Sequence, residues 1–189
     1  MTTRRRLLAA LTGGAVAGIA SRPIARADNP APPAPVPIVA APGSSPPLVA
    51  LTPGMPLPTF AAVARDYALL GNDDLAGWPT LLMFFASWCP HCQAEAPRLA
   101  AIAARYPAVR VIPFAVADHE TPNDAFAFGE QFALPFPTYW DGGRAARAAG
   151  VQAYPTLVAA DVTGIVRGVA VGEQTETQLD ALLAPIVPV

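Results

Sequence analysis

The chain has 189 residues, 53% of them hydrophobic and 14% charged, with a formal net charge of −2 at pH 7. This length and composition fit one globular domain with a hydrophobic core and exclude a chain built from polar low-complexity sequence. Five basic residues and no acidic residue lie in residues 1–27. The remainder therefore holds 7 basic and 14 acidic residues, a net charge of about −7, which argues against nucleic acid or an anionic membrane as a partner.

Residues 1–27 are typical of an export signal. Three consecutive arginines at 4–6 form a basic region, residues 7–20 are mildly apolar, and Ala25-Arg26-Ala27 has the small-x-small form of a cleavage site. Residues 3–8 also resemble a twin-arginine signal, with an ordinary Sec signal as the alternative. Because the apolar stretch is short and rich in glycine, an uncleaved anchor is disfavoured. We therefore expect a periplasmic protein, soluble or loosely associated with the membrane, in an oxidising compartment.

Residues 28–58 are predicted to form a linker. They contain eleven of the chain's 23 prolines. Proline fixes φ and lacks a backbone donor, so an extended, polyproline-like spacer is expected. A recognition role for this segment has no specific support, and we expect one folded domain over residues 59–189.

The predicted elements of that domain alternate between strands and helices. In chain order we expect short apolar segments at 60–63 and 67–70, a helical turn at 73–77, a strand at 80–85, a helix at 89–106, a strand at 109–116, a helix at 125–132, a short segment at 138–140, a helix at 144–149, strands at 156–160 and 165–171, and a helix at 175–183. The strand at 80–85 is apolar throughout, which is typical of a central strand covered on both faces. A helical crossover makes it parallel to the next strand. The order predicts one α/β layer fold with an inserted helix–strand segment after the first βαβ unit and a hairpin near the end.

Both cysteines of the chain lie in one motif, Cys89-Pro90-His91-Cys92, between the apolar strand and the helix that follows it. Unpaired N–H groups at a helix N-terminus stabilise a thiolate, and the short spacing closes a small, reversible ring. A structural zinc site would need four ligands, and a haem attachment signal would need histidine where Gln93 stands. The motif therefore predicts thiol–disulfide exchange, with no metal and no cofactor besides the redox-active Cys89–Cys92 disulfide.

The two cysteines have different predicted roles. We expect Cys89, exposed at the helix N-terminus, to be the nucleophile, and Cys92, one turn inside, to be the resolving thiol. Pro90 suits the first helical turn and shapes it. His91 offers a donor that would further favour the Cys89 thiolate.

A wider set of segments carries a family resemblance. They are residues 53–60, 75–79, 85–92, 95–97, 136–137 and 150–156, together with the turn at 161–164. With these segments, residues from about 52 to 187 resemble the TlpA/ResA/DsbE group of exported thiol–disulfide oxidoreductases. The resemblance implies a thioredoxin-like fold, with a central mixed sheet flanked by helices. It also implies that Pro155, preceded by Tyr154, is cis, packs against the cysteines and exposes a backbone edge on which an extended substrate pairs.

Two further positions are singled out near the motif. The resemblance puts at Glu95 an acid that handles the proton of the buried cysteine, whereas the acid position of thioredoxin itself is occupied here by Met83. The alternative is a solvated glutamate helped by the helix dipole. Trp88 is expected either to cover the disulfide and shape the docking face or to be an aromatic residue at the edge of the core.

Three functions are compatible with these features. The first is an exported reductant of protein disulfides, such as those of apocytochrome c or a copper-site protein, fed by a membrane thiol donor of the DsbD/CcdA type. The second is a DsbA-like oxidase or isomerase, because Pro90-His91 is the dipeptide of strongly oxidising exported proteins. The third is a metal- or haem-chaperone module using Cys89, Cys92 and His91. We expect the first, while the direction of electron flow and the oligomeric state stay open.

Overall fold

The structure is a computed structural model that describes residues 51–187, so the predicted export signal and most of the predicted linker lie outside the described residues. In the described part, one seven-stranded sheet has the order β2-β1-β5-β4-β3-β6-β7. The strands are β1 (Ala61–Val63), β2 (Leu69–Gly71), β3 (Thr80–Phe85), β4 (Arg110–Ala115), β5 (Tyr139–Trp140), β6 (Thr156–Ala160) and β7 (Val166–Val171). The helices are α1 (Asn72–Leu75), α2 (Pro90–Arg105), α3 (Pro122–Gln131), α4 (Arg144–Ala148) and α5 (Glu176–Leu183).

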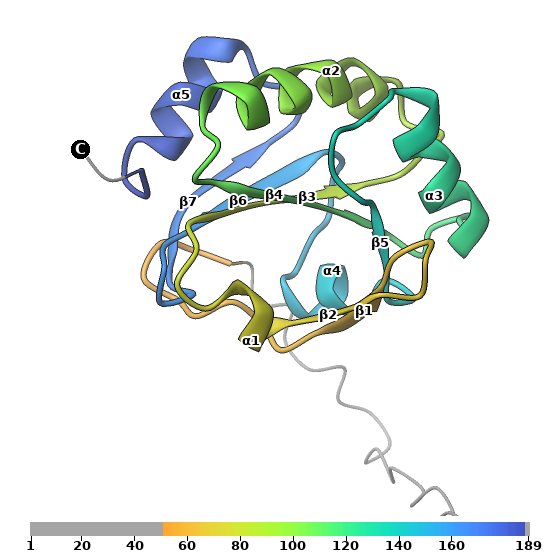
Figure 1. The fold of residues 1–189 in the computed structure, drawn as a ribbon, viewed down its shortest axis with the longest axis horizontal. Helices are drawn as coiled ribbons and strands as arrows, with labels where there is room; N and C mark the ends of the chain where they lie inside the picture. Colours follow the sequence, from red (N-terminus) through yellow and green to blue (C-terminus); the bar gives the residue numbers. More distant parts are fainter. Residues whose placement is uncertain (1–50, 188–189) are drawn as a thin grey trace, which may run out of the picture. The chain divides into compact units, whose positions relative to one another are not determined.

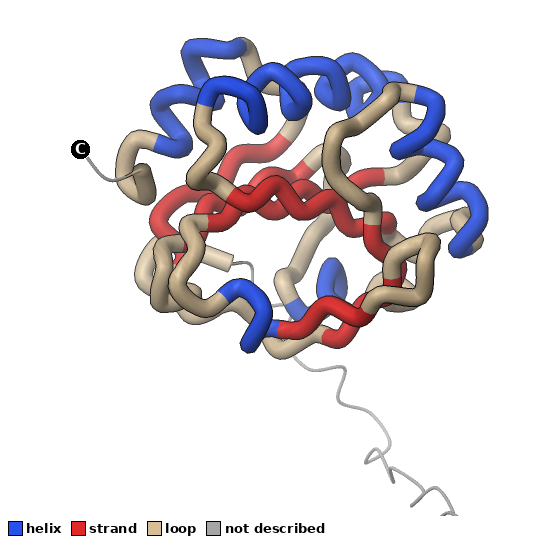
Figure 2. Tube along the Cα trace, viewed as in Figure 1, coloured by secondary structure: helices blue, strands red, loops and turns tan. Residues whose placement is uncertain are grey.

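Helices lie on both faces of the central strands. Figure 1 shows α2, α3 and α5 over one face of β3, β4 and β6 and α4 on the other, and in Figure 2 the strands β1 and β2 lie beyond α4. β3 runs parallel to β4 and antiparallel to β6. The sheet is therefore mixed, and the predicted α/β layer fold with a parallel β3–β4 crossover is confirmed.

Strand β3 is the centre of the hydrophobic core. All six of its residues are buried, as a strand covered on both faces requires. The rings of Phe85 and Phe128 stack with centroids 4.3 Å apart, and Phe84 stacks on Phe114 at 5.9 Å. Such pairs stabilise a core by more than their buried area alone. The end of β3 is thereby held firmly, and α2 begins five residues later.

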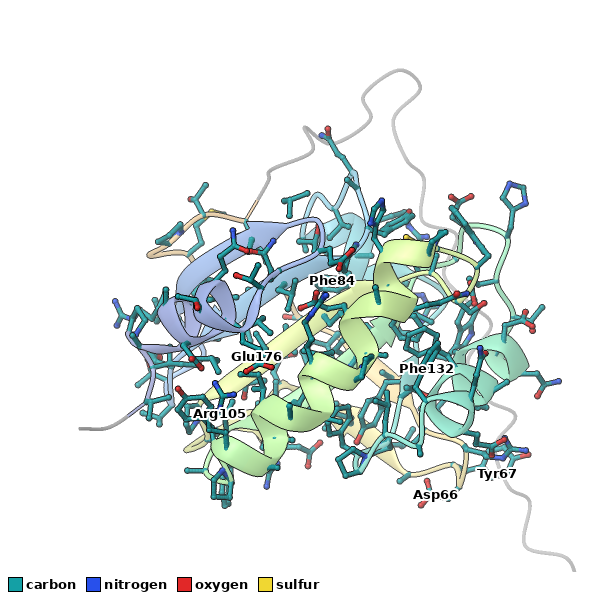
Figure 3. All side chains as sticks on the ribbon, turned by 90° about the horizontal axis from the view of Figure 1, so that it is seen from above. Asp66, Tyr67, Phe84, Arg105, Phe132 and Glu176 are labelled. Carbon is teal, nitrogen blue, oxygen red and sulfur yellow. The ribbon has the colours of Figure 1, made fainter. Side chains whose placement is uncertain are left out.

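Ion pairs join α2 to α5. Arg105, in the last turn of α2, contacts Glu176 at 2.7 Å and Asp180 at 2.8 Å. Figure 3 shows Arg105 and Glu176 side by side where the two helices meet. Tyr106 adds a hydrogen bond from its hydroxyl to Asp180 at 3.0 Å. The C-terminal end of α2 is thus fixed to α5, and its N-terminal end carries the cysteines.

Two predicted boundaries are corrected. α3 begins at Pro122 rather than at residue 125, because Thr121 and Asp124 form a capping box ahead of the apolar positions. The packed part of the chain also begins before residue 59, since Leu51 and Leu57 are buried. The N–H of Leu57 donates to the Gly164 carbonyl at 2.9 Å. The last residues of the predicted linker therefore pack on the β6–β7 hairpin. Across residues 51–187, no helix combines the length and the apolar character needed to cross a bilayer.

Candidate active site

The motif of two cysteines lies at the N-terminal end of α2, after the turn that follows β3. Cys89 is the N-cap of α2 in an extended conformation, and Pro90 is its first helical residue. Proline suits this position because its missing N–H would be unpaired there and its φ is already helical. The N–H of Cys89 donates to the Ala86 carbonyl at 3.1 Å, which closes the turn after the strand. Both cysteines are free thiols in the structure.

Cys89 is less accessible than the sequence predicts. It is buried, with 7% of its surface exposed. The reason is the segment that precedes β6: the Cys89 thiol donates to the Tyr154 carbonyl, with Sγ and O 3.6 Å apart. The Tyr154–Pro155 peptide is cis, as the resemblance implies. The sulfur therefore lies against the backbone edge of this segment.

Trp88 forms the rim of the site rather than a full cover. About half of its surface is exposed. Its indole Nε1 donates to the Asp118 carbonyl at 2.9 Å, and its ring meets Tyr154 edge-on with centroids 6.3 Å apart. Trp88 is therefore a hydrogen-bonded, partly exposed aromatic side chain packed on Tyr154.

Cys92 is the inner thiol. It has no exposed surface. Burial raises the pKa of the Cys92 thiol well above its ordinary value, against a smaller opposite effect of the Ala86 backbone. The negative charge of Glu95 raises the pKa of Cys92 further. Cys92 therefore keeps its proton unless a nearby group accepts it.

Glu95 is a buried carboxyl, and the solvated alternative is wrong. It has no exposed surface. Its Oε2 accepts hydrogen bonds from the backbone N–H of Gln174 at 2.9 Å and from Arg98 at 3.4 Å. Its Oε1 is buried with no hydrogen-bond partner among the described residues. Burial raises the pKa of Glu95, and the bond from Gln174 opposes this. The Glu95 carboxylate therefore binds a proton more readily than a solvated glutamate does.

His91 does not serve Cys89. Its Nδ1 lies 3.1 Å from Glu173 Oε2, and its side chain is 68% exposed. His91 is the second residue of α2, and its side chain lies with residues 172–175, between β7 and α5. The expected donor to the Cys89 thiolate is therefore absent from the hydrogen bonds of residues 51–187, and the prediction is corrected.

Sequence reasoning missed Glu120. Its Oε1 accepts from the Ser87 N–H at 2.5 Å, and its Oε2 is buried without a partner in the described part of the chain. Burial raises the pKa of Glu120, and the bonds from Ser87 oppose this. One signal was available: parallel strands end at the same edge of a sheet, so the loop after β4 should lie beside the loop after β3.

Residues 172–175 form another wall that sequence reasoning missed. The N–H of Gly172 donates to the Pro155 carbonyl at 2.7 Å. Glu173 pairs with Arg98 at 2.7 Å, and Gln174 contacts Glu95 through its backbone. A backbone donor leaves no mark in the sequence, so no residue type signalled this loop.

The arrangement suits two-electron exchange between a dithiol and a disulfide. One sulfur caps a helix at a backbone edge, and the second lies one turn deeper beside a buried carboxyl that can take up or release a proton. Among residues 51–187, no group of three or more histidine, cysteine, aspartate or glutamate side chains is placed to hold a metal ion.

Known proteins are similar to this chain in sequence and in fold. The profile of the AhpC/TSA family matches residues 53–169. The chain is 30% identical to the thiol-disulfide oxidoreductase ResA of Bacillus thuringiensis over 136 residues, 71% of this chain and 79% of ResA. It is 35% identical to the thiol:disulfide interchange protein DsbE of Xylella fastidiosa over 140 residues, 71% of this chain and 68% of that one. The crystal structure of a secreted Mycobacterium tuberculosis disulfide oxidoreductase homologous to E. coli DsbE superposes with a TM-score of 0.60. That protein is 25% identical in sequence to this chain, and the match covers 67% of this chain and 96% of the M. tuberculosis chain.

Proposed function

The chain belongs to the AhpC/TSA family and is a thiol–disulfide oxidoreductase of the ResA/DsbE type, and from this we propose that it reduces protein disulfides outside the cytoplasm through Cys89 and Cys92. The observation that carries the proposal is the buried Cys92 thiol beside the buried Glu95 carboxyl, with Cys89 at the helix N-cap. Protein thiols and disulfides are its substrates.

The proposed reaction has two steps. The Cys89 thiolate attacks one sulfur of the substrate disulfide, forming a mixed disulfide and releasing the other substrate sulfur as a thiolate. Cys92 then loses its proton to Glu95 and attacks the Cys89 sulfur, which releases the second substrate sulfur. The substrate gains two electrons and the enzyme is left with the Cys89–Cys92 disulfide. Pro90 sets the first turn of α2, and the segment of Tyr154 and Pro155 pairs with the extended substrate beside Trp88.

The direction of electron flow rests on how His91 is paired. Reference potentials run from about −270 mV for thioredoxin to about −120 mV for DsbA. A histidine that stabilised the Cys89 thiolate would favour the oxidising end of this range, but His91 contacts Glu173 instead. This supports a reductant, regenerated by a membrane thiol donor of the DsbD/CcdA type and acting on apocytochrome c or a copper-site protein. The same contact weakens the metal- or haem-chaperone alternative, which needs His91 beside the cysteines.

Export is part of this proposal. A reductant fed across the membrane needs its cysteines on the outer side, and residues 1–27 supply the signal. Mass spectrometry of the exported protein should show a mature N-terminus near Asp28. An intact N-terminus recovered from the membrane fraction would replace cleavage with an anchor.

Two measurements test the activity itself. Cys92→Ser should trap mixed disulfides with partner proteins, because attack by Cys89 still occurs and resolution does not, whereas Cys89→Ser should trap none. The equilibrium potential against glutathione should lie nearer to that of thioredoxin than to that of DsbA. A potential near DsbA would support the oxidase alternative, and trapping by Cys89→Ser alone would reverse the roles of the two cysteines.

A further inference from the structure

A continuous series of polar side chains in contact leads from His91, in the dipeptide between the cysteines, to the buried Glu95 carboxyl. His91 Nδ1 contacts Glu173 Oε2 at 3.1 Å, and Glu173 Oε1 contacts Arg98 at 2.7 Å. Arg98 in turn reaches Glu95 Oε2 at 3.4 Å. His91, Glu95 and Arg98 all belong to α2, where residues three and seven positions apart share a face. Glu173 comes from the loop before α5 and joins His91 to Arg98, because it contacts both.

The loop that carries Glu173 is fixed at both sides of the site. The N–H of Gly172 donates to the Pro155 carbonyl at 2.7 Å, and the N–H of Gln174 donates to Glu95 at 2.9 Å. Glu173 lies between these two anchored residues, so its carboxylate is held over α2. Its side chain is only one-third exposed.

We propose that Glu173 is a positioning residue that sets the proton affinity of Glu95 by competing with it for Arg98. Arg98 lies closer to Glu173 than to Glu95, so its charge is shared unequally. The inference deepens the proposed function, because it concerns the acid that we assign to the resolution step. Residues 172–175 then take part in the resolution step, although they lie outside the motif of the two cysteines.

The charges around Glu95 give the sign of the effect. Facing it are Arg98 and the Cys92 thiol on α2, and Glu173 from the loop; Glu173 itself faces His91 and Arg98. Glu173 opposes ionisation of Glu95 in two ways: it adds a like charge nearby, and it binds the Arg98 guanidinium at a shorter distance than Glu95 does. Removing its charge should therefore make Glu95 a stronger acid.

The test is an NMR titration of the full-length reduced protein labelled with ¹³C at the glutamate carboxyl carbons. The Glu95 signal is assigned by its loss in Glu95→Gln. In Glu173→Gln the Glu95 titration should move to lower pH by about half a unit, which is the size expected for a partly exposed ion pair. Glu173→Asp keeps the charge and should leave the midpoint near that of the unsubstituted protein.

Glu176→Gln is the matched control. It removes the same charge three residues further along, from a side chain that pairs with Arg105 and not with Arg98. The Glu95 midpoint should stay in place in this variant. In an Arg98→Gln background, Glu173→Gln should shift the midpoint less, because the competition is gone and only the direct charge effect is left.

The inference is overturned if Glu173→Gln leaves the Glu95 midpoint where Glu176→Gln leaves it, or moves it upward. These outcomes differ from a failure of the proposed function. If Glu95→Gln resolved mixed disulfides at the normal rate, Glu95 would not be the proton acceptor in resolution. The NMR midpoints would still show whether Glu173 changes the pH at which Glu95 titrates.

Discussion

This site differs from that of thioredoxin in the position of the acid near the buried cysteine, which here is Glu95 on α2. Met83 in β3 is fully buried and carries no charge, so it cannot accept the proton of Cys92 as the acid of thioredoxin does at this position. Glu95 lies one helical turn beyond Cys92, with a raised pKa caused first by burial. We predict that Glu95→Gln slows resolution of the mixed disulfide by about a hundredfold, the lower end of the range of general acid–base effects. Stopped-flow reduction of a model disulfide across pH measures it.

The first step supplies the internal control for that prediction. Attack by Cys89 does not use the Glu95 proton, so its rate should change much less in Glu95→Gln. The resolution rate should also lose its pH dependence in the region where Glu95 titrates, which lies above the ordinary value of 4.5 because the pKa is raised. An unchanged resolution rate and pH profile would leave Glu95 with a structural role only.

Glu120 is predicted to hold the turn that precedes Cys89. Its Oε1 accepts from the Ser87 N–H, so Glu120→Ala leaves this donor without its partner. The loss of one such bond at a partly buried site costs about 1–3 kcal/mol of unfolding free energy. Glu120→Gln keeps an acceptor oxygen and should restore most of the stability. Urea unfolding of the three proteins measures this, and equal losses in both variants would contradict the role of the hydrogen bond.

At the scale of elements, local patterns predicted most of the fold. The apolar run of β3 and the cysteine motif with a proline at the first helical position place the strand, the turn and α2 without tertiary information. Glu95 was also reached from the sequence, through the family resemblance. The remaining walls of the site depend on long-range contacts: Glu120 reaches Ser87 across 33 positions, and Gln174 reaches Glu95 across 79. No local period encodes such contacts, and in both the donor is a backbone N–H group.

The β6–β7 hairpin is predicted to depend on one carboxylate in its turn. Asp161 Oδ1 accepts from the N–H groups of Thr163 and Ile165, and its Oδ2 accepts from Arg167 at 2.7 Å. Asp161→Ala removes these bonds and should cost about 2 kcal/mol of unfolding free energy. Because Leu57 pairs with Gly164 in the same turn, its amide should also lose protection.

Hydrogen exchange followed amide by amide tests both parts of this prediction. The matched control is Asp124→Ala, which removes a carboxylate from the cap of α3, far along the chain from the hairpin. It should destabilise the protein modestly without exposing the Leu57 amide. Protection of Leu57 that is equal in Asp161→Ala and in the unsubstituted protein would show that the N-terminal segment is held by other contacts.

At the scale of the whole molecule, two sets of carboxyl groups act on stability in opposite directions. Burial raises the pKa values of Glu95 and Glu120 in the folded state. Their contribution is present below the ordinary value of 4.5 and is lost as pH rises through the raised values. Hydrogen bonds lower the pKa values of Asp124 and Asp161, led in both cases by threonine side chains. Their contribution is present above the ordinary value of 3.8 and is lost as pH falls through the lowered values.

These signs predict a maximum of stability in mildly acidic solution rather than at neutral pH. The free energy of unfolding of the reduced protein, measured with urea between pH 3 and pH 8, should fall on both sides of this maximum. Since the neutral-side loss comes from ionising two buried acids, Glu95→Gln combined with Glu120→Gln should flatten that side and leave the acid side unchanged, because Asp124 and Asp161 still titrate there. A neutral-side slope that survived in the double variant would mean that groups other than Glu95 and Glu120 take up or release the protons on unfolding.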